Sequence, residues 1–399
     1  MNELRPQLWY SLKGYSKAAF FKDVTSGIIV AIIALPLSIA LALASGVSPE
    51  QGVYTAIVAG FLISALGGSK VQVSGPTAAF ATIVAGIVAK NGMDGLIVAT
   101  ILAGIILMVM GFLHMGSIIK FIPYTITTGF TAGIAVTIVI GQLKDFMGLT
   151  FQTAPVETME KLEQVFACIS TVNVPAVGLG CFALAILFLW PKSLQKIPAS
   201  LVAVIATAVI VQIGQLPIHT IGDLYTISSA LPSFHMPGLS YGTVAAVLPD
   251  AFTIAILAAI ESLLSCVVAD EMIGARHNSN MELVAQGVGN TASALFGGIP
   301  ATGAIARTAA NIRNGAVSPV SGMVHAIVLL LILVLLMPYA ALIPMPCIAA
   351  ILFQVAYNMS GWRKVIDLIK HSPKSDIAVL VLTFVLTVCF DLVVAIVVG

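Results

Sequence analysis

Two charged side chains lie inside long apolar runs of this sequence. Glu261 is near the middle of the run 247–269, and Arg307 lies two turns into the run 300–313. If these runs cross a membrane, each charge costs at least about 2.5–3.5 kcal/mol on insertion scales, so it is expected to face the protein interior and to serve a function. Arg307 could add positive potential to an anion cavity, pair with Glu261, or extend toward the nearer membrane surface.

Glu261 is the residue with the clearest chemistry. An acid inside a membrane usually marks coupling to a proton or another cation. Ser262 and Ser265 follow it, and Ser265 is one helical turn on, where it could share a cavity face with the carboxyl. Both hydroxyls could instead bond to the helix backbone. We expect proton coupling at Glu261, Ser262 and Ser265, with a sodium ion near Glu261 and Ser265 as the alternative and no other metal site.

Two segments, 76–90 and 300–313, are too short to cross about 30 Å of hydrocarbon at about 1.5 Å per residue. Each follows a Gly-Gly pair and begins at a proline, Pro76 or Pro300, which suits the first turn of a helix. The first also follows an extended stretch at 71–74. We predict two half-helices that begin inside the bilayer, and paired interruptions of this kind in two halves of a chain mark transporter binding sites. Two ordinary kinked helices are the alternative.

The starts of these half-helices predict an anion site. Helix N-termini carry unpaired N–H groups and a partial positive charge, so two of them aimed at one cavity can bind an anion without a lysine. Small residues there let a ligand reach the backbone, although they also suit close helix packing. Pro36 kinks the first apolar run and is expected to place Ser38 in the cavity wall. The predicted substrate-binding residues are Ser38, Ser74, Gly75, Thr77, Ala301, Thr302, Gly303 and Arg307.

The composition excludes a soluble domain. Hydrophobic residues make up 59% of the 399 and charged ones 9%, with a mean hydropathy of +1.06, whereas soluble domains carry about 25% charged residues. The net charge of +1 gives no field that would attract nucleic acid. The sequence has no GxxxxGK[ST] phosphate loop and no catalytic constellation, so we expect neither an enzyme nor a cofactor. The polar stretch from Asp270 to Asn290 is expected to be a solvated loop and not a metal site.

We predict an all-α polytopic membrane protein with about fourteen segments, since a spanning helix needs about 20 apolar residues. The segments are 24–45, 51–66, 76–90, 94–113, 121–142, 174–190, 198–215, 247–269, 283–297, 300–313, 320–337, 343–359, 376–390 and 391 onward. They divide into halves at 23–215 and 247–399, with an N-terminal segment at 1–22 and a linker at 216–246.

Charged residues in the loops orient these segments. Lysine and arginine gather in the loops on the side of the N-terminus, and only Lys90, Lys144 and Lys161 fall on the other side. Cytoplasmic loops carry such an excess of positive charge. We therefore expect a multi-pass protein of the bacterial inner membrane with both termini in the cytoplasm, and no cleaved signal peptide at the polar N-terminus.

The residues around the second half-helix resemble the SulP family of sulfate permeases. The stretch 282–290 (ELVAQGVGN) precedes 296–308 (FGGIPATGAIART), and Pro36-Leu37-Ser38 resembles the family in the first run. The similarity covers essentially the whole chain and is strongest to the branch with bacterial dicarboxylate and bicarbonate transporters. It implies seven plus seven inverted helices in a core and a gate domain, with the central site between the third and tenth helices. It also implies a homodimer and a C-terminal STAS domain, which we expect to be absent from a chain that ends at Gly399.

The resemblance implies a secondary active transporter of small anions that works by alternating access, and two half-helices fit such a mechanism. Sulfate, bicarbonate and C4-dicarboxylates are the candidate substrates. Proton-coupled symport is favoured, because sodium-coupled relatives look to have aspartate where this chain has Glu261. A sodium-coupled bicarbonate symporter and an uncoupled anion facilitator or channel are the alternatives. A nucleobase permease is a third class with the same inverted-repeat architecture.

Overall fold

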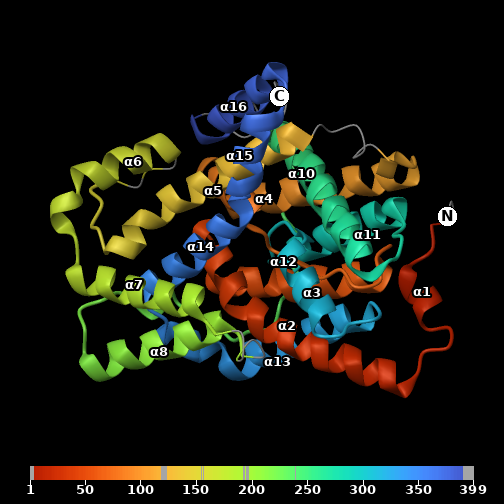
Figure 1. The fold of residues 1–399 in the computed structure, drawn as a ribbon, viewed down its shortest axis with the longest axis horizontal. Helices are drawn as coiled ribbons and strands as arrows, with labels where there is room; N and C mark the ends of the chain where they lie inside the picture. Colours follow the sequence, from red (N-terminus) through yellow and green to blue (C-terminus); the bar gives the residue numbers. More distant parts are fainter. Residues whose placement is uncertain are drawn as a thin grey trace.

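The computed structural model describes residues 4–117, 124–153, 155, 157–191, 194, 197–238 and 240–389, which are mostly helical (Figure 1). The longer helices are α2 (Lys17–Ala44), α3 (Pro49–Leu66), α4 (Ala81–Phe112), α5 (Tyr124–Met147), α7 (Val174–Leu189), α8 (Ala199–Gly214), α10 (Tyr241–Ile273), α11 (Ser279–Leu295), α13 (Val320–Leu336), α14 (Met345–Ser360) and α16 (Lys374–Cys389). The shorter elements are α1 (Gln7–Ser11), β1 (Ser74–Gly75), the 3-10 helix η1 (Ala78–Phe80), α6 (Thr158–Ala167), η3 (Ile169–Thr171), α9 (Ile221–Leu224), β2 (Thr302–Gly303), α12 (Ile305–Arg313), η5 (Met337–Leu342) and α15 (Trp362–His371).

The helices coincide with the predicted apolar segments. Each segment from 24–45 to 376–390 overlaps a helix, and the last, from 391 on, lies outside the described residues. Within the described part of the chain, five helical stretches are long and apolar enough to cross a membrane by length and composition alone. The predicted linker 216–246 contains α9 and the start of α10. The number of spans and the inverted repeat stay predictions.

Local sequence signals explain where these helices begin and bend. Ser16 caps α2 by accepting a hydrogen bond from a backbone N–H of its first turn, and Ser48 begins α3 with a capping box. Gly92 interrupts α4 with a φ of 68°, a backbone conformation that favours glycine. The predicted segments 76–90 and 94–113 are therefore two helical stretches that meet at Gly92.

The two expected half-helices begin later than predicted. Strands β1 and β2 form a short antiparallel sheet, with Ser74 opposite Gly303 and Gly75 opposite Thr302. The prediction that a helix starts at each proline is wrong, because both prolines lie in backbone that precedes α4 and α12. Extended backbone inside a membrane must satisfy its N–H and C=O groups within the protein. Pairing the two strands achieves this, and it fixes the two half-helices relative to each other.

The helices pack in two groups. In the first, α4 lies along α10 and α11, α3 along α11 and α13, and α2 along α13. In the second, α14 packs against both α5 and α7, and α16 packs against α5. Figure 1 shows α5, α7 and α14 toward the left, with α3, α11 and α12 toward the right. The β1–β2 sheet contacts α3 and α10 and so belongs to the first group. The division into a core and a gate domain stays a prediction.

A buried acid, which the sequence did not single out, fastens the N-terminal segment to this first group. Asp23 is fully buried and accepts a hydrogen bond from the Tyr15 hydroxyl at 2.6 Å. It also accepts from the backbone N–H groups of Val317 (2.7 Å) and Ser318 (3.1 Å). Burial, together with the bond to Asp23, raises the pKa of Tyr15 to about 12, so the phenol stays a donor at neutral pH.

Tyr15→Phe is expected to lower the unfolding temperature of the protein in detergent. The change keeps the ring but leaves a buried carboxylate one donor short, which costs about 1–3 kcal/mol. Tyr10→Phe is the control, because the Tyr10 hydroxyl has no hydrogen-bond partner within the described residues. A thermal melt of both variants tests this, and equal unfolding temperatures would show that Tyr15 does not hold Asp23.

Candidate functional site

Glu261 of α10 lies beside the paired strands. Its Oε2 accepts hydrogen bonds from the hydroxyls of Thr77 and Thr302, each at 2.9 Å, and these two hydroxyl oxygens are 3.3 Å apart. Thr302 is fully buried, whereas Thr77 and Glu261 remain partly exposed. The structure thus brings together three predicted site residues from distant parts of the chain. Their oxygens surround one point at which a proton or a small cation can be held.

Arg307 of α12 is 1% exposed, so it does not extend to a membrane surface. Its Nη2 donates to the Ser38 hydroxyl (3.2 Å) and the Pro76 carbonyl (3.3 Å). Nε and Nη1 have no hydrogen-bond partner within the described residues. The alternative of a salt bridge with Glu261 is therefore wrong, because the threonine hydroxyls hold the acid while Ser38 and the Pro76 carbonyl hold the guanidinium. A buried cation without an acidic partner makes its surroundings electropositive.

Gly75 allows this guanidinium to lie against the backbone of β1. A Cβ at this position would be 2.2 Å from Arg307 Nη1, which is well inside a normal van der Waals separation. Gly75→Ala is therefore expected to displace Arg307 and to weaken binding of an anion near it about tenfold, because one hydrogen bond to a charged group would be lost.

Isothermal titration of the purified variant with sulfate measures this effect. Gly86→Ala is the matched control, because a Cβ at Gly86 of α4 would meet no atom within 4 Å. Unchanged sulfate affinity in Gly75→Ala would show that the position of Arg307 does not matter for binding.

Ser262 and Ser265 hold the second half-helix. Ser262 Oγ accepts from the N–H of Gly303 at 3.1 Å, and Ser265 Oγ lies 3.3 Å from the hydroxyl of Thr308. Both serines are fully buried. Within the described residues neither hydroxyl bonds to its own helix, so the alternative of backbone bonding is wrong, and the role of both serines in coupling stays a prediction. A sodium ion bound at Glu261 Oε2 would lie next to the hydroxyls of Thr77 and Thr302, and its contact with Ser265 stays a prediction.

The other predicted residues of the strands keep the sheet in place. Ser74 Oγ accepts from Gln286 Nε2 at 3.3 Å. The Ala301 N–H donates to Asn290 Oδ1 (2.8 Å), and Asn290 Nδ2 donates to the Ala301 carbonyl (2.9 Å). Gly303 leaves room for the side chain of Gln72, because a Cβ at this position would be 2.3 Å from Gln72 Nε2. Side chains of α11 thus add hydrogen bonds to a sheet that packs against α3 and α10, and the two threonines supply the side chains that bind Glu261.

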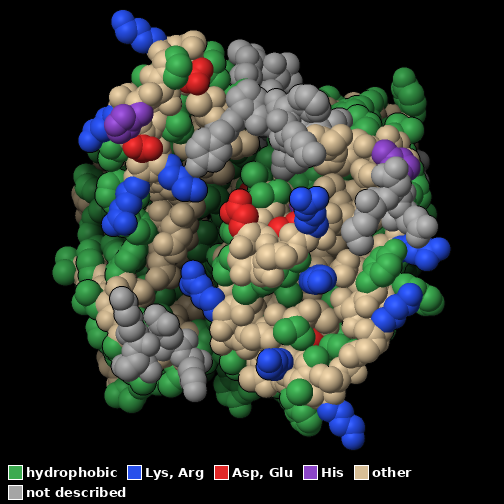
Figure 2. All heavy atoms as spheres, turned by 45° about the vertical axis from the view of Figure 1, so that its right-hand side comes forward, with side chains coloured by type: hydrophobic (Ala, Val, Ile, Leu, Met, Phe, Trp, Pro, Cys, Tyr) green, Lys and Arg blue, Asp and Glu red, His purple; other side chains and the backbone are tan. Residues whose placement is uncertain are grey.

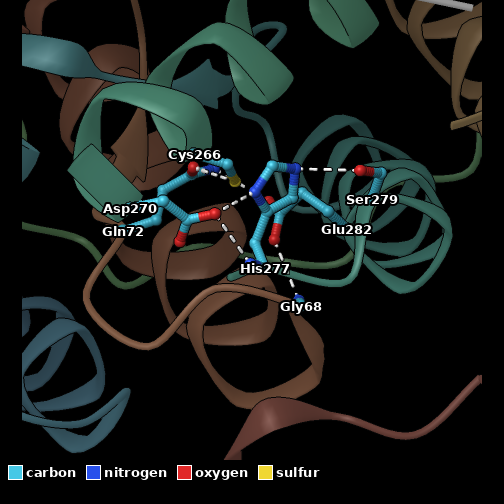
Figure 3. A network of polar contacts seen from close by, with 7 residues as sticks. All are labelled: Gly68, Gln72, Cys266, Asp270, His277, Ser279 and Glu282. Carbon is cyan, nitrogen blue, oxygen red and sulfur yellow. Dashed lines mark hydrogen bonds and ion pairs between the residues drawn. The ribbon is translucent and has the colours of Figure 1, made fainter. Parts of the chain in front are cut away.

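The prediction of a solvated loop is wrong for the polar side chains of α11 that make these contacts. Glu282 is 1% exposed, so it does not belong to a solvated loop. Its carboxylate accepts hydrogen bonds from the Gly68 N–H (2.9 Å) and Gln72 Nε2 (2.8 Å), as Figure 3 shows. Gln286 Nε2 donates to the same carboxylate at 2.9 Å. The four-residue spacing from Glu282 through Gln286 to Asn290 places all three on one helix face, and this spacing was the available signal.

The turn between α10 and α11 is closed by His277. Its Nδ1 lies 2.7 Å from Asp270 Oδ2, and its Nε2 lies 2.9 Å from Ser279 Oγ (Figure 3). Across the part of the chain that the structure describes, no group of three or more His, Cys, Asp or Glu residues is placed to hold a metal ion. The histidine therefore serves the connection between the two helices.

Comparisons with known proteins point to one family. The sequence matches the model of the sulfate permease family over residues 20–383. A Bacillus subtilis protein named "Putative sulfate transporter YvdB" is 44% identical over 389 residues, which cover 97% of this chain and 73% of that protein. The bicarbonate transporter BicA of Picosynechococcus is 32% identical over 392 residues, which cover 94% of this chain and 68% of that protein.

Solved structures share the fold. The transmembrane domain of a cyanobacterial bicarbonate transporter BicA has a TM-score of 0.84 at 30% identity, over 95% of this chain and 97% of that one. The murine Slc26a9 anion transporter in the inward-facing state has a TM-score of 0.89 at 20% identity, over 99% of this chain and 69% of that one. At that identity the second match supports the fold alone.

Proposed function

Because the chain belongs to the sulfate permease family, we propose that it moves a small oxyanion across a membrane together with a proton, by alternating access. Family membership makes it an anion-transport protein and not an enzyme, as the sequence predicts. Sulfate and bicarbonate are the first candidate substrates, because relatives are named for them. C4-dicarboxylates are a further candidate. The loop charges support an N-terminus in the bacterial cytoplasm, and the homodimer stays a prediction.

The observation that carries this proposal is the separation of Glu261 from Arg307. Each charge has its own hydroxyl partners, and neither neutralises the other. An anion near Arg307 would add a second negative charge beside the carboxylate, and two such charges about 4 Å apart repel by about 4 kcal/mol at an effective dielectric constant of about 20. Protonation of Glu261 removes this repulsion. Proton and anion binding therefore favour each other, which is the linkage that symport requires.

Free backbone donors support an anion position beside these charges. No side chain caps α12, so the N–H groups of its first turn have no side-chain acceptor and can bind a ligand. Residues at the start of α12, Ile305 and Ala306, are exposed, which leaves a route to this helix end. Arg307 follows directly behind them and adds its positive charge. An oxyanion offers several acceptor oxygens to such a set of donors.

Sodium coupling is the second candidate, and the oxygens around Glu261 favour it. The carboxylate and the hydroxyls of Thr77 and Thr302 supply hard oxygen ligands. A sodium ion bound there would also cancel the repulsion between Glu261 and an anion. The two candidates differ only in the ion that Glu261 accepts.

Uptake of labelled sulfate into proteoliposomes tests the substrate. We expect uptake above that of protein-free liposomes, with inhibition by unlabelled sulfate and by whichever of bicarbonate and fumarate shares the site. Uracil should not inhibit, because a buried arginine and free N–H donors select for negative charge. Inhibition by uracil and by none of the anions would favour a nucleobase permease. Uptake that only equalises the two concentrations under every gradient would favour a facilitator.

A further inference from the structure

A hollow of about 330 Å³ lies where the N-terminal segment meets the first group of helices. Its walls include Tyr10 and Ser11 of α1, Ser16 at the start of α2, Lys70 of the loop before β1, and Ser318 before α13. The Gln7 N–H donates to the Gly67 carbonyl at 2.8 Å and so holds α1 over the hollow. The anion site described above does not include any of these residues.

The lining offers positive charge and hydroxyl donors. Lys70 is exposed and has no acidic partner within the described residues. The hydroxyl of Tyr10 has no hydrogen-bond partner there either. Ser16 Oγ accepts from the Ala19 N–H, and its own O–H can still donate. Asp23 is fully buried, and its carboxylate already accepts hydrogen bonds from the backbone N–H groups of Val317 and Ser318. It therefore does not offer a free acceptor to the hollow. A ligand with anionic oxygens matches this set.

Exposed apolar side chains are adjacent in sequence to the N-terminal residues that line the hollow. Trp9 is 61% exposed and Phe21 67% exposed, with Leu12 and Phe20 also on the surface. Aromatic side chains of this kind gather at the interface of a bilayer, with the apolar part in the acyl region. The exposed lysines nearby in the sequence are Lys13, Lys17 and Lys22.

The charge on this side of the molecule suits a negative membrane surface. Figure 2, which brings the side with α1 and α11 forward, shows lysine and arginine side chains distributed over that face and few acidic ones. Each basic residue near an anionic leaflet contributes about 1 kcal/mol of attraction. The basic side chains of this face and the donors that line the hollow therefore both favour a lipid with a negatively charged headgroup.

We propose that this hollow binds the phosphate headgroup of an anionic phospholipid from the leaflet on the N-terminal side. Its phosphate oxygens accept from Lys70 and from the hydroxyls of Tyr10 and Ser16, and its acyl chains extend over the exposed aromatic residues. Because the hollow is lined by α1, the loop before β1 and the segment before α13, the bound lipid bridges the N-terminal segment and the first group of helices. Nothing in this proposal depends on which anion or which ion the protein transports.

Titration of the delipidated, detergent-purified protein with headgroup-labelled phosphatidylglycerol tests this. We expect saturable binding, weakened about tenfold in Lys70→Gln by the loss of a charge-assisted contact and weakened less in Tyr10→Phe. Lys374→Gln is the matched control: this lysine is also exposed, at the start of α16, but does not line the hollow.

Three results would overturn the proposal. The first is wild-type affinity in both Lys70→Gln and Tyr10→Phe. The second is equally tight binding of phosphatidylcholine, which would show that the site does not select negative charge. The third is displacement of the lipid by inorganic phosphate at comparable concentration, which would make the hollow a site for a free anion.

Discussion

Glu261→Gln is expected to abolish anion accumulation driven by a proton gradient while leaving the anion site assembled. A glutamine carbonyl oxygen can accept the hydrogen bonds from Thr77 and Thr302 that the carboxylate accepts, but it cannot take up a proton. An inward gradient of one pH unit can drive up to about tenfold accumulation for each proton that moves with the anion. In the variant we expect the internal and external anion concentrations to become equal.

Proteoliposomes with and without a pH gradient measure this difference. Glu271→Gln is the matched control, because Glu271 is an exposed carboxyl near the end of the same helix. The control should accumulate anion as the wild type does. Gradient-driven accumulation that persists in Glu261→Gln would exclude this residue as the proton acceptor.

Arg307→Ala is expected to weaken anion binding and uptake by at least about tenfold. Contacts to a charged group contribute about 1.5–3 kcal/mol each, and the guanidinium is the only fully buried arginine or lysine side chain within the described residues. Two of its nitrogens are buried without a hydrogen-bond partner there, so an anion or a water molecule that reached them would receive their hydrogen bonds. Arg307→Lys should bind the anion more tightly than Arg307→Ala but more weakly than the wild type, because lysine keeps the positive charge but lacks the planar set of N–H donors of a guanidinium.

Sulfate titration and sulfate uptake are both needed for this variant, since removing a buried side chain also lowers stability. Arg313→Ala is the control, because Arg313 ends the same helix α12 and is exposed. If Arg307→Ala folds and both its affinity and its uptake equal those of the wild type, the positive potential at this position is not what binds the anion.

Sequence reasoning identified the charged residues of the site but not their contacts. Glu261 and Arg307 stand out because charges are rare in apolar runs, and the Gly- and Pro-interrupted segments indicated where the strands lie. The pairing of Ser74 with Gly303 could not be derived, because it depends on bringing residues from both halves of the chain together. Without that pairing, a salt bridge between Glu261 and Arg307 looked reasonable.

Two short helices and two groups of buried polar residues were not predicted, for a different reason. Membrane segments are recognised in a sequence by continuous apolar runs, and the amphipathic helices α6 and α15 have none. The same approach treated the polar row from Glu282 to Asn290 as solvated, although its four-residue spacing marks one helix face. Nothing in the sequence singles out Asp23, and only the tertiary fold shows that Tyr15 and residues 317–318 surround it.

The central claim is that one proton enters with the anion through Glu261, and a pH-sensitive dye sealed inside proteoliposomes tests it most directly. Sulfate, or whichever anion the uptake assay identifies, is added outside in sodium-free buffer at equal pH on both sides. The account predicts acidification of the lumen with the wild type and none with Glu261→Gln. Entry of labelled anion without acidification would contradict it, and entry that requires added sodium would assign the carboxylate to sodium instead.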